Sequence, residues 1–260
     1  MFELYYNNAQ MCIEQSYNET NATVLLIRKL EQFGRVSDDE RRVVEATSFI
    51  ISRVKADQDI AQEGERLLTC PLLLDGFACR YRTLESGQRQ IVAFLLPNDF
   101  CDLTSLLQRK LDHSIGTLTP ARIAFIPHAA VLGWIGHHPG LGQLLWRATL
   151  IDAASSREWI VNVGRRTAYQ RTAHLLCELM LRMRAAGRAR GLTCEMPLTQ
   201  LELADALGLT PVHVNRTLQW LRSESLIEFG GGMLTVRNWR ELKRAAGFNS
   251  VYLHQPAFAA

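Results

Sequence analysis

Two helix signals joined by a glycine constrain the C-terminal part of this 260-residue chain more than any other feature. The stretch LTQLELADALGLTPVHVNRTLQWLR begins at Leu198. Thr199 and Glu202 form a capping box that opens one short helix, and Gly208 ends that helix. A second amphipathic helix follows at once. Two helices joined by so short a turn predict a helix-turn-helix.

The second helix has its own start signal. Thr210 offers a capping hydroxyl, and Pro211 stands at the first helical position, where its missing N–H does no harm. Apolar residues then recur with the helical period, so one face should pack on the first helix. The positions expected to face the core are Val214, Leu218 and Leu221, with Val212 as a further candidate.

The first two turns of this second helix also carry side chains that a protein core would not accept. Arg216 can donate two hydrogen bonds to guanine, and Asn215 or Gln219 can pair with adenine. His213 suits either a base or a phosphate. This chemistry at the start of a second helix predicts reading of the major groove of double-stranded DNA. The residues expected to bind DNA are Thr199, Gln200, Thr210, Pro211, Val212, His213, Asn215, Arg216 and Gln219.

The neighbours of the second helix support this interpretation. Pro211 and Val212 can give apolar contact to a thymine methyl group, while Thr199 and Gln200 lie at a helix N-terminus, which favours phosphate. The following stretch LIEFGGGMLTVRN has two β-like runs around Gly230-Gly231-Gly232, which predicts a hairpin, or wing. A helical hairpin that serves only for packing is the alternative. Local charges nearly balance, so affinity would come from placement and dimerisation.

Short strand-like runs occupy residues 49–126. They are rich in Ile, Val, Phe, Leu and Thr, and Gly, Pro, Asn and Asp separate them. Strands at this spacing predict an antiparallel barrel or jelly roll. A capping box formed by Ser37 and Glu40 predicts a short helix ahead of them, to about Ser48. The runs are FIISRV, LLTCPLLLDGFACRYRTL, RQIVAFLL, SIGTLT and ARIAFI.

Residues 139–164 hold a helical period over about 25 residues. A helix of that length exceeds what a neighbouring small barrel needs, so we expect two copies of the chain to pair along it as a homodimer. Gly164 is expected to end the helix, and a second helix should run from there to Gly187.

Arginine supplies all the positive charge of residues 157–190, where eight arginines face only two glutamates. Arginine suits phosphate better than lysine does. A solvated helix face is the alternative.

The remaining composition describes an ordinary globular chain, with a net charge of +3 and 47% hydrophobic residues. The six cysteines stand singly without a CxxC motif, which indicates buried thiols in a reducing compartment and no metal site. A redox-sensing thiol is the alternative, and no motif supports it. No apolar run reaches the roughly 18 residues needed to span a bilayer, and no signal peptide is evident. We therefore expect a cytoplasmic protein with no membrane partner.

The order of these parts resembles the Crp/Fnr family of bacterial transcription regulators. The resemblance covers about residues 25–248, and EGERLLTCPLLLDGFACRYRTLESGQRQIVAFLLPNDFCDL is similar to the family's sensor barrel. The phrases GRRTAYQRTAHLLCEL and TPVHVNRTLQ resemble a branch common in alphaproteobacteria. The implied fold is α+β. Its parts are an N-terminal extension (1–22), a cyclic-nucleotide-binding-like β jelly roll (23–138), a dimerisation helix (139–164) and a C-terminal winged helix-turn-helix DNA-binding domain (165–260).

The resemblance implies a homodimer that regulates transcription from a pseudo-palindromic DNA operator, with RNA polymerase as a further partner. In the family, an arginine at the position of Arg216 contacts guanine in each half-site. Val212 stands where many members have an acidic residue, and Pro211 stands where some have arginine. The half-site sequence should therefore differ from the family's usual ones.

The family's phosphate cassette is altered. Members that bind cyclic nucleotides have a Gly-Glu-Leu run and an Arg-Ser or Arg-Thr pair, whereas this chain has Asp102-Leu103-Thr104 and His113-Ser114. We therefore expect no control by cyclic nucleotide, and the effector-binding residues stay unknown. The N-terminal cysteine cluster of oxygen-sensing members is also missing, with only Cys12 in that region. His113, Cys79 or Cys101 could be nominated as haem ligands without a motif behind them, so no cofactor or metal is expected.

Two other classes of function compete with this one. Small barrels of this kind also host metal-dependent, cupin-like enzymes, which need several histidines and a carboxylate to converge. Only His113 precedes His128 in the barrel region, so we expect no enzyme. A module that binds a partner other than DNA is the third class, and the exposed polar residues of the second helix argue against it. The histidines expected to be structural or at the surface are His113, His128, His137 and His138.

Overall fold

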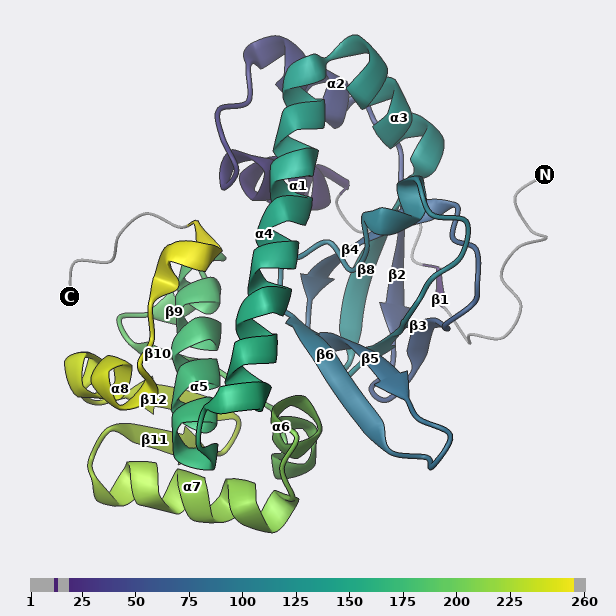
Figure 1. Ribbon diagram of the computed structural model, residues 1–260. Helices are drawn as coiled ribbons and strands as arrows, with labels where there is room; N and C mark the ends of the chain where they lie inside the picture. Colours follow the sequence, from purple (N-terminus) through teal and green to yellow (C-terminus); the bar gives the residue numbers. More distant parts are fainter. Residues whose placement is uncertain (1–11, 14–18, 255–260) are drawn as a thin grey trace. The chain divides into compact units, whose positions relative to one another are not determined.

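The computed structural model describes residues 12–13 and 19–254, so most of the expected extension, residues 1–22, lies outside the described residues. The chain divides into two compact units (Figure 1). The first contains the described residues up to Arg82 together with Phe94–Thr149. The second contains Thr83–Ala93 together with the described residues from Leu150 onward.

Two four-stranded sheets form the jelly roll, and the paired strands run antiparallel. Their strand orders, β1-β2-β8-β4 and β3-β7-β5-β6, put strands distant in sequence side by side. The expected β-rich fold is therefore confirmed. The strands are β1 (Cys12–Ile13), β2 (Ile50–Val54), β3 (Asp59–Ala61), β4 (Thr69–Asp75), β5 (Ala78–Thr83), β6 (Arg89–Leu95), β7 (Ser114–Thr117) and β8 (Ala121–Pro127), and the helices before and between them are α1 (Glu19–Glu31), α2 (Asp38–Glu45), η1 (Thr104–Leu106) and α3 (His128–His137).

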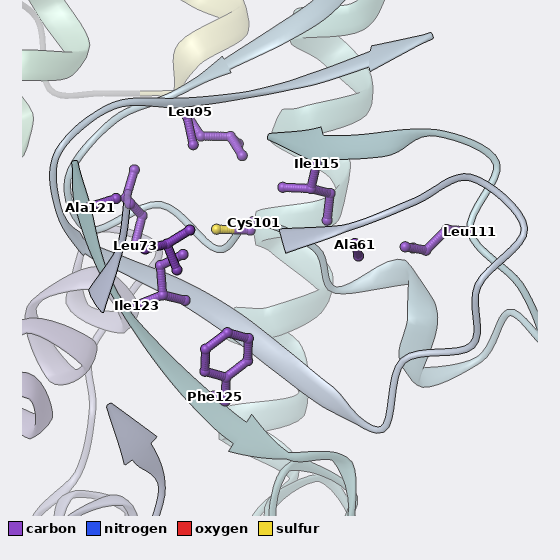
Figure 2. Close-up of a cluster of buried hydrophobic side chains, with 11 residues drawn as sticks. Ala61, Leu73, Leu95, Cys101, Leu111, Ile115, Ala121, Ile123 and Phe125 are labelled. Atoms are coloured by element: carbon purple, nitrogen blue, oxygen red, sulfur yellow. The ribbon is translucent and has the colours of Figure 1, made fainter. Parts of the chain in front are cut away.

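Apolar side chains from both sheets fill the space between them. Figure 2 shows Leu73, Ile123 and Phe125 from one sheet together with Leu95 and Ile115 from the other. All five are buried. Burying one such side chain stabilises a fold by about 1.5–3 kcal/mol, so the sequence uses this interior as a core.

The second unit is built around α5. Apolar residues surround almost the whole helix, as expected for one that is buried on most sides, and it packs against α6, α7 and α8. A small sheet of order β11-β12-β10-β9 completes the unit. The elements after the jelly roll are α4 (Pro139–Arg165), α5 (Ala168–Ala185), β9 (Ala189–Arg190), β10 (Thr193–Glu195), α6 (Gln200–Leu207), α7 (Pro211–Ser223), β11 (Ile227–Gly230), β12 (Met233–Val236), α8 (Trp239–Ala246) and η2 (Ser250–Leu253).

The expected long helix is present as α4, which has 27 residues, but Gly164 does not end it. The helix passes through Gly164 and stops at Arg165. The break is set by the next helix, because Thr167 and Gln170 form a capping box that starts α5. Gly187 has a φ of +71°, as expected for a glycine that closes α5. Among the described helices, none combines the length and the apolar character that crossing a bilayer requires.

Several elements were not predicted. The polar first residues obscured α1, although Ala22, Leu26 and Leu30 carry a helical period and are buried. The helix α3 contains glycines that disfavour helix formation. Tertiary contact holds it, since Trp134 is buried and donates from Nε1 to Thr47 Oγ1 at 3.1 Å. The strand β3 and the helix α8 were also missed.

Replacing Gly76 with alanine should destabilise the jelly roll by more than the cost of placing a side chain at a positive φ, because the new Cβ would also overlap neighbouring atoms. Gly76 has a φ of +87°, and an added Cβ would overlap the carbonyl oxygen of Pro120 and lie 2.9 Å from Ala121 Cα. Gly87 has a similar φ of +82° with open space around it. Gly87→Ala should therefore lower the free energy of unfolding by about 1–2 kcal/mol, and Gly76→Ala by clearly more. Denaturant unfolding of both variants measures this, and equal losses would contradict it.

Candidate functional site

The helix α6 starts with the capping box that its sequence predicts. The backbone N–H of Glu202 donates to Thr199 Oγ1 at 3.2 Å, and the Glu202 carboxylate accepts from the Thr199 N–H at 2.6 Å. Gly208 ends the helix in the left-handed conformation, with a φ of +61°. The turn to the next helix is therefore fixed at both of its ends.

The start and the buried face of α7 also agree with the sequence. Thr210 Oγ1 accepts from the His213 N–H at 3.3 Å, and Pro211 is the first helical residue. Val214, Leu218 and Leu221 are fully buried. This apolar face anchors α7 to the rest of the unit.

A row of exposed side chains lies on the opposite face of α7. Arg216, Gln219 and His213 are all exposed. Within the described part of the chain, the Arg216 guanidinium makes no hydrogen bond or ion pair. Val212 is 69% exposed, so its placement in the core was wrong and its alternative placement on the outer face is right. An unengaged arginine in such a row is free to bind a ligand outside the chain.

Asn215 lies differently from its neighbours on α7. Its side chain is half-buried, and Nδ2 donates to Gln200 Oε1 at 3.1 Å. The amide that was expected to pair with adenine therefore has a partner within the chain. Gln200 is the first residue of α6, so the bond joins the two helices.

The predicted wing is the antiparallel hairpin of β11 and β12. Gly231 and Gly232 both have positive φ values at its tip, which explains the need for glycine there. Arg222 of α7 donates to the carbonyl oxygen of Phe229 in β11. A hollow of about 440 Å³ lies between the hairpin, α7 and the start of α6, with Gln200 in its lining.

In the jelly roll, the side chain of Asp102 accepts hydrogen bonds from backbone amides in the turn that follows it. Its carboxylate accepts from the N–H of Ser105 at 2.8 Å, and from the N–H and hydroxyl of Thr104 at 3.2 and 2.7 Å. Burial alone would raise the pKa of Asp102, but these hydrogen bonds and the positive charge of Arg80 outweigh it, so its pKa lies below the ordinary value. Asp102 is therefore a buried, ionised carboxylate.

The residues nominated for haem do not converge on an open site. Burial raises the pKa of Cys101 to about 12, which keeps it an unreactive thiol. The Nδ1 atom of His113 lies 2.6 Å from the Asp112 carboxylate, and the ring is buried. The described residues contain no group of three or more His, Cys, Asp or Glu side chains placed to hold a metal ion.

Two of the other histidines make contacts within the chain. His128 Nε2 lies 3.2 Å from the hydroxyl of Ser105, and His137 Nδ1 lies 2.9 Å from the Gly133 carbonyl oxygen. His137 is exposed, and both distances are those of hydrogen bonds.

Two models of known domains match two separate parts of the chain. A Crp-like helix-turn-helix domain matches residues 170–245, and a cyclic nucleotide-binding domain matches residues 51–138. The nitrogen fixation regulation protein FixK of Bradyrhizobium diazoefficiens is 30% identical over 165 residues, which are 63% of this chain and 68% of that protein. The chain belongs to the Crp/Fnr family of transcription regulators.

Other members of the Crp/Fnr family are also similar. The transcriptional activator protein FnrL of Cereibacter sphaeroides is 28% identical over 229 residues, 86% of this chain and 91% of that protein. The solved structure of FixK2 from Bradyrhizobium japonicum superposes with a TM-score of 0.70 at 23% identity, covering 76% of this chain and 97% of that one. The structural similarity to FixK2 supports the fold, and the α+β architecture expected from the sequence is confirmed. As a member of this family, the chain is a transcription regulator with a DNA-binding helix-turn-helix domain.

Several arginines of the arginine-rich stretch in this Crp/Fnr chain make ion pairs and hydrogen bonds within the chain. Arg166 pairs with Glu158 at 2.5 Å, Arg182 pairs with Glu178 at 3.2 Å, and Arg171 donates to the Leu207 carbonyl oxygen at 3.0 Å. These three guanidinium groups are therefore used within the chain. The arginines of the stretch that are exposed are Arg157, Arg165, Arg188 and Arg190.

The sequence did not indicate an aromatic cluster at the far end of α7. Trp220 is 55% exposed and lies 4.7 Å, between ring centroids, from Tyr169 of α5. Its Nε1 donates to Glu224 at 2.8 Å, and the Tyr169 hydroxyl donates to the same carboxylate. Because Tyr169 is far from α7 in sequence, no local pattern could have paired them.

Asp102→Asn should make the free energy of unfolding less dependent on pH in the acidic range. The folded pKa of Asp102 lies below its ordinary value near 3.8, so its ionised form stabilises the fold above that value, and this contribution is lost as pH falls through the folded pKa. At neutral pH the variant should be less stable by about 1–3 kcal/mol, because asparagine cannot replace all the charged acceptors. The difference should shrink towards about pH 3, as denaturant unfolding at each pH measures. A difference that does not vary with pH would contradict the ionised, hydrogen-bonded carboxylate.

Proposed function

We propose that the chain binds a pseudo-palindromic DNA operator as a homodimer, with α7 of each copy in the major groove of one half-site. The observation that carries this proposal is the exposed, unengaged Arg216 within the polar row on α7. Major-groove reading needs such a row on the first turns of a helix that is anchored by its other face. Buried Val214, Leu218 and Leu221 supply that anchor.

The proposed base contacts follow from the chemistry of each exposed side chain. Arg216 donates two hydrogen bonds to guanine, and Gln219 pairs with adenine. His213 meets a base or a phosphate, and Pro211 and Val212 give apolar contact. These last two replace the charged residues of other members, so the preferred half-site differs from theirs.

Other residues hold the DNA backbone. Thr199 and Gln200 lie at the N-terminus of α6, and Thr210 caps α7. The positive end of each helix dipole favours a phosphate oxygen nearby. Such contacts fix the register of α7 and carry no sequence information themselves.

Exposed apolar side chains along α4 support the homodimer. Trp146, Leu150 and Ile160 follow one another on α4 at intervals of four and ten residues, which fit the core positions of a heptad, and Trp146 and Ile160 are 67% and 68% exposed. Apolar side chains at this spacing form the seam between paired helices. A second copy of α4 would remove them from water.

Three features support independence from cyclic nucleotides. The interior of the jelly roll is packed with apolar side chains (Figure 2). The Asp102 carboxylate already occupies backbone amides of the η1 turn. His113, where cyclic-nucleotide-binding members have an arginine, lies against Asp112. An anionic ligand would meet the negative charge of Asp102 there, and the nearby guanidinium of Arg80 already donates to the carbonyl oxygens of Cys101 and Phe100.

The remaining assignments follow from the family. The phrase TPVHVNRTLQ favours the alphaproteobacterial branch, RNA polymerase is the further partner of a bound dimer, and the site of action is the cytoplasm, where the operator DNA is. The chain acts as a regulator and not as an enzyme, because the exposed groups of α7 are suited to binding.

Arg216→Ala should weaken specific DNA binding by about 1–3 kcal/mol and relax the preference at one base pair in each half-site. The operator is obtained by selecting bound DNA from a random pool, and titrations with that operator and its single-base variants measure both effects. If Arg216→Ala keeps the full base preference of the wild-type protein, Arg216 does not contact guanine as proposed.

The matched control is Arg240→Ala, which removes another exposed arginine, from α8. It should leave the base preference unchanged.

Light scattering of the free protein should give the mass of two chains, and a mass of one chain would contradict the homodimer.

Titration calorimetry with cyclic AMP should show no heat of binding, and saturating cyclic AMP should leave operator affinity unchanged. The physical reason is the charge of Asp102 and the packed interior described above. Binding at micromolar concentration would contradict the proposed independence and leave the DNA-binding proposal intact.

A further inference from the structure

We propose that Asn215 is a positioning residue, which holds the side chain of Gln200 ready for the DNA backbone and does not itself read a base. The inference rests on the proposed function, since it concerns the same interface. It changes the role expected for Asn215 from its place in the recognition helix, where an asparagine would pair with adenine.

The position of Asn215 on α7 carries the first part of the argument. A helix turns by about 100° per residue, so Asn215 points away from the direction taken by Arg216. Its side chain is half-buried against α6, whereas those of Arg216 and Gln219 are exposed. Pairing with adenine requires the donor and the acceptor of the asparagine amide together. One of the two N–H groups on Nδ2 is already bonded to Gln200 Oε1 at 3.1 Å, and this bond directs the amide towards α6.

Gln200 gains a fixed geometry from this bond. Its main chain is held by the capping box that Thr199 and Glu202 form, in which Glu202 is buried. The side chain alone would be free to rotate, and Asn215 restrains it by binding the amide oxygen. In the described part of the chain, Gln200 Nε2 donates no hydrogen bond. Its N–H groups are thus free to donate to an acceptor such as a phosphate oxygen.

A second contact from the same flank of α7 supports the interpretation. Arg222 lies seven residues after Asn215, two helical turns on, and donates to the Phe229 carbonyl oxygen in the wing. The hollow of about 440 Å³ lies beside this flank and is lined by Gln200, Arg222 and the wing glycines. One flank of α7 therefore holds the start of α6 and the wing in place, while the exposed row remains for bases.

The experiment compares Asn215→Ala, Gln200→Ala and the double variant on the operator selected by the wild-type protein. Each single variant should lower affinity about two- to tenfold per half-site, because Asn215→Ala leaves a Gln200 side chain that must be ordered on binding and Gln200→Ala removes the contact. The base preference should not change. The double variant should bind no more weakly than Gln200→Ala, since Asn215 acts through Gln200.

Phosphate ethylation interference supplies a readout that a general loss of structure would not give. Ethylation of one phosphate in each half-site should weaken the wild-type protein and have no effect on Gln200→Ala or Asn215→Ala. Gln219→Ala is the matched control on the same helix, and it should keep this phosphate effect and alter the preference at one base pair. Thermal unfolding of each variant reports whether the fold is intact.

The outcomes separate the inference from the proposed function. If Asn215→Ala alters the preference at one base pair, or adds its full loss to that of Gln200→Ala, Asn215 reads DNA directly and the inference is wrong. Should Asn215→Ala fail to fold, Gln200→Ala still tests the contact, because an unchanged phosphate pattern in that variant overturns the inference. If the wild-type protein selects no sequence at all, the proposed function itself fails.

Discussion

A carboxylate with no access to solvent, that of Glu178, holds three segments of the second unit together. Trp159 of α4 donates to it at 3.0 Å, Tyr252 of η2 at 2.8 Å, and Arg182 of α5 at 3.2 Å. A buried carboxylate without such donors would strongly destabilise the fold. Burial, followed by the charge of Glu178, raises the pKa of Tyr252, so its phenol keeps the proton that it donates. The C-terminal part of α4 and the last described residues are therefore both fixed to the helix that supports α7.

A second polar contact continues this arrangement along the same helices. Glu158 pairs with Arg166 at 2.5 Å and lies 3.2 Å from His174. Desolvation, and then the nearby charge of Arg166, lowers the pKa of His174 to about 4, so its ring is neutral at neutral pH and packs against Phe248 and Tyr252. The carboxylates of Glu158 and Glu178 are thus both used in contacts that join α4 to α5. That use explains why an arginine-rich sequence alone does not identify a phosphate-binding surface.

Local signals predicted the helix-turn-helix because the forces that set its ends act within a few residues. Thr199, Gly208 and Thr210 determine where α6 ends and α7 begins through their own hydrogen bonds and dihedral angles. The roles on the surface of α7 depend on partners far along the chain, such as Gln200 for Asn215. Val212 shows the same limit, because the helical period alone placed it on either face. The helix α3 forms through the packing of Trp134, which no local propensity contains.

The packed jelly roll has a consequence for how such a regulator responds to the cell. The Asp102 carboxylate is bonded to backbone amides of the η1 turn, and apolar side chains fill the space between the two sheets. Under the proposed independence from cyclic nucleotides, the fraction of promoter sites occupied would be set by the concentration of the protein. Synthesis and degradation of the polypeptide would then control transcription in place of a diffusible second messenger.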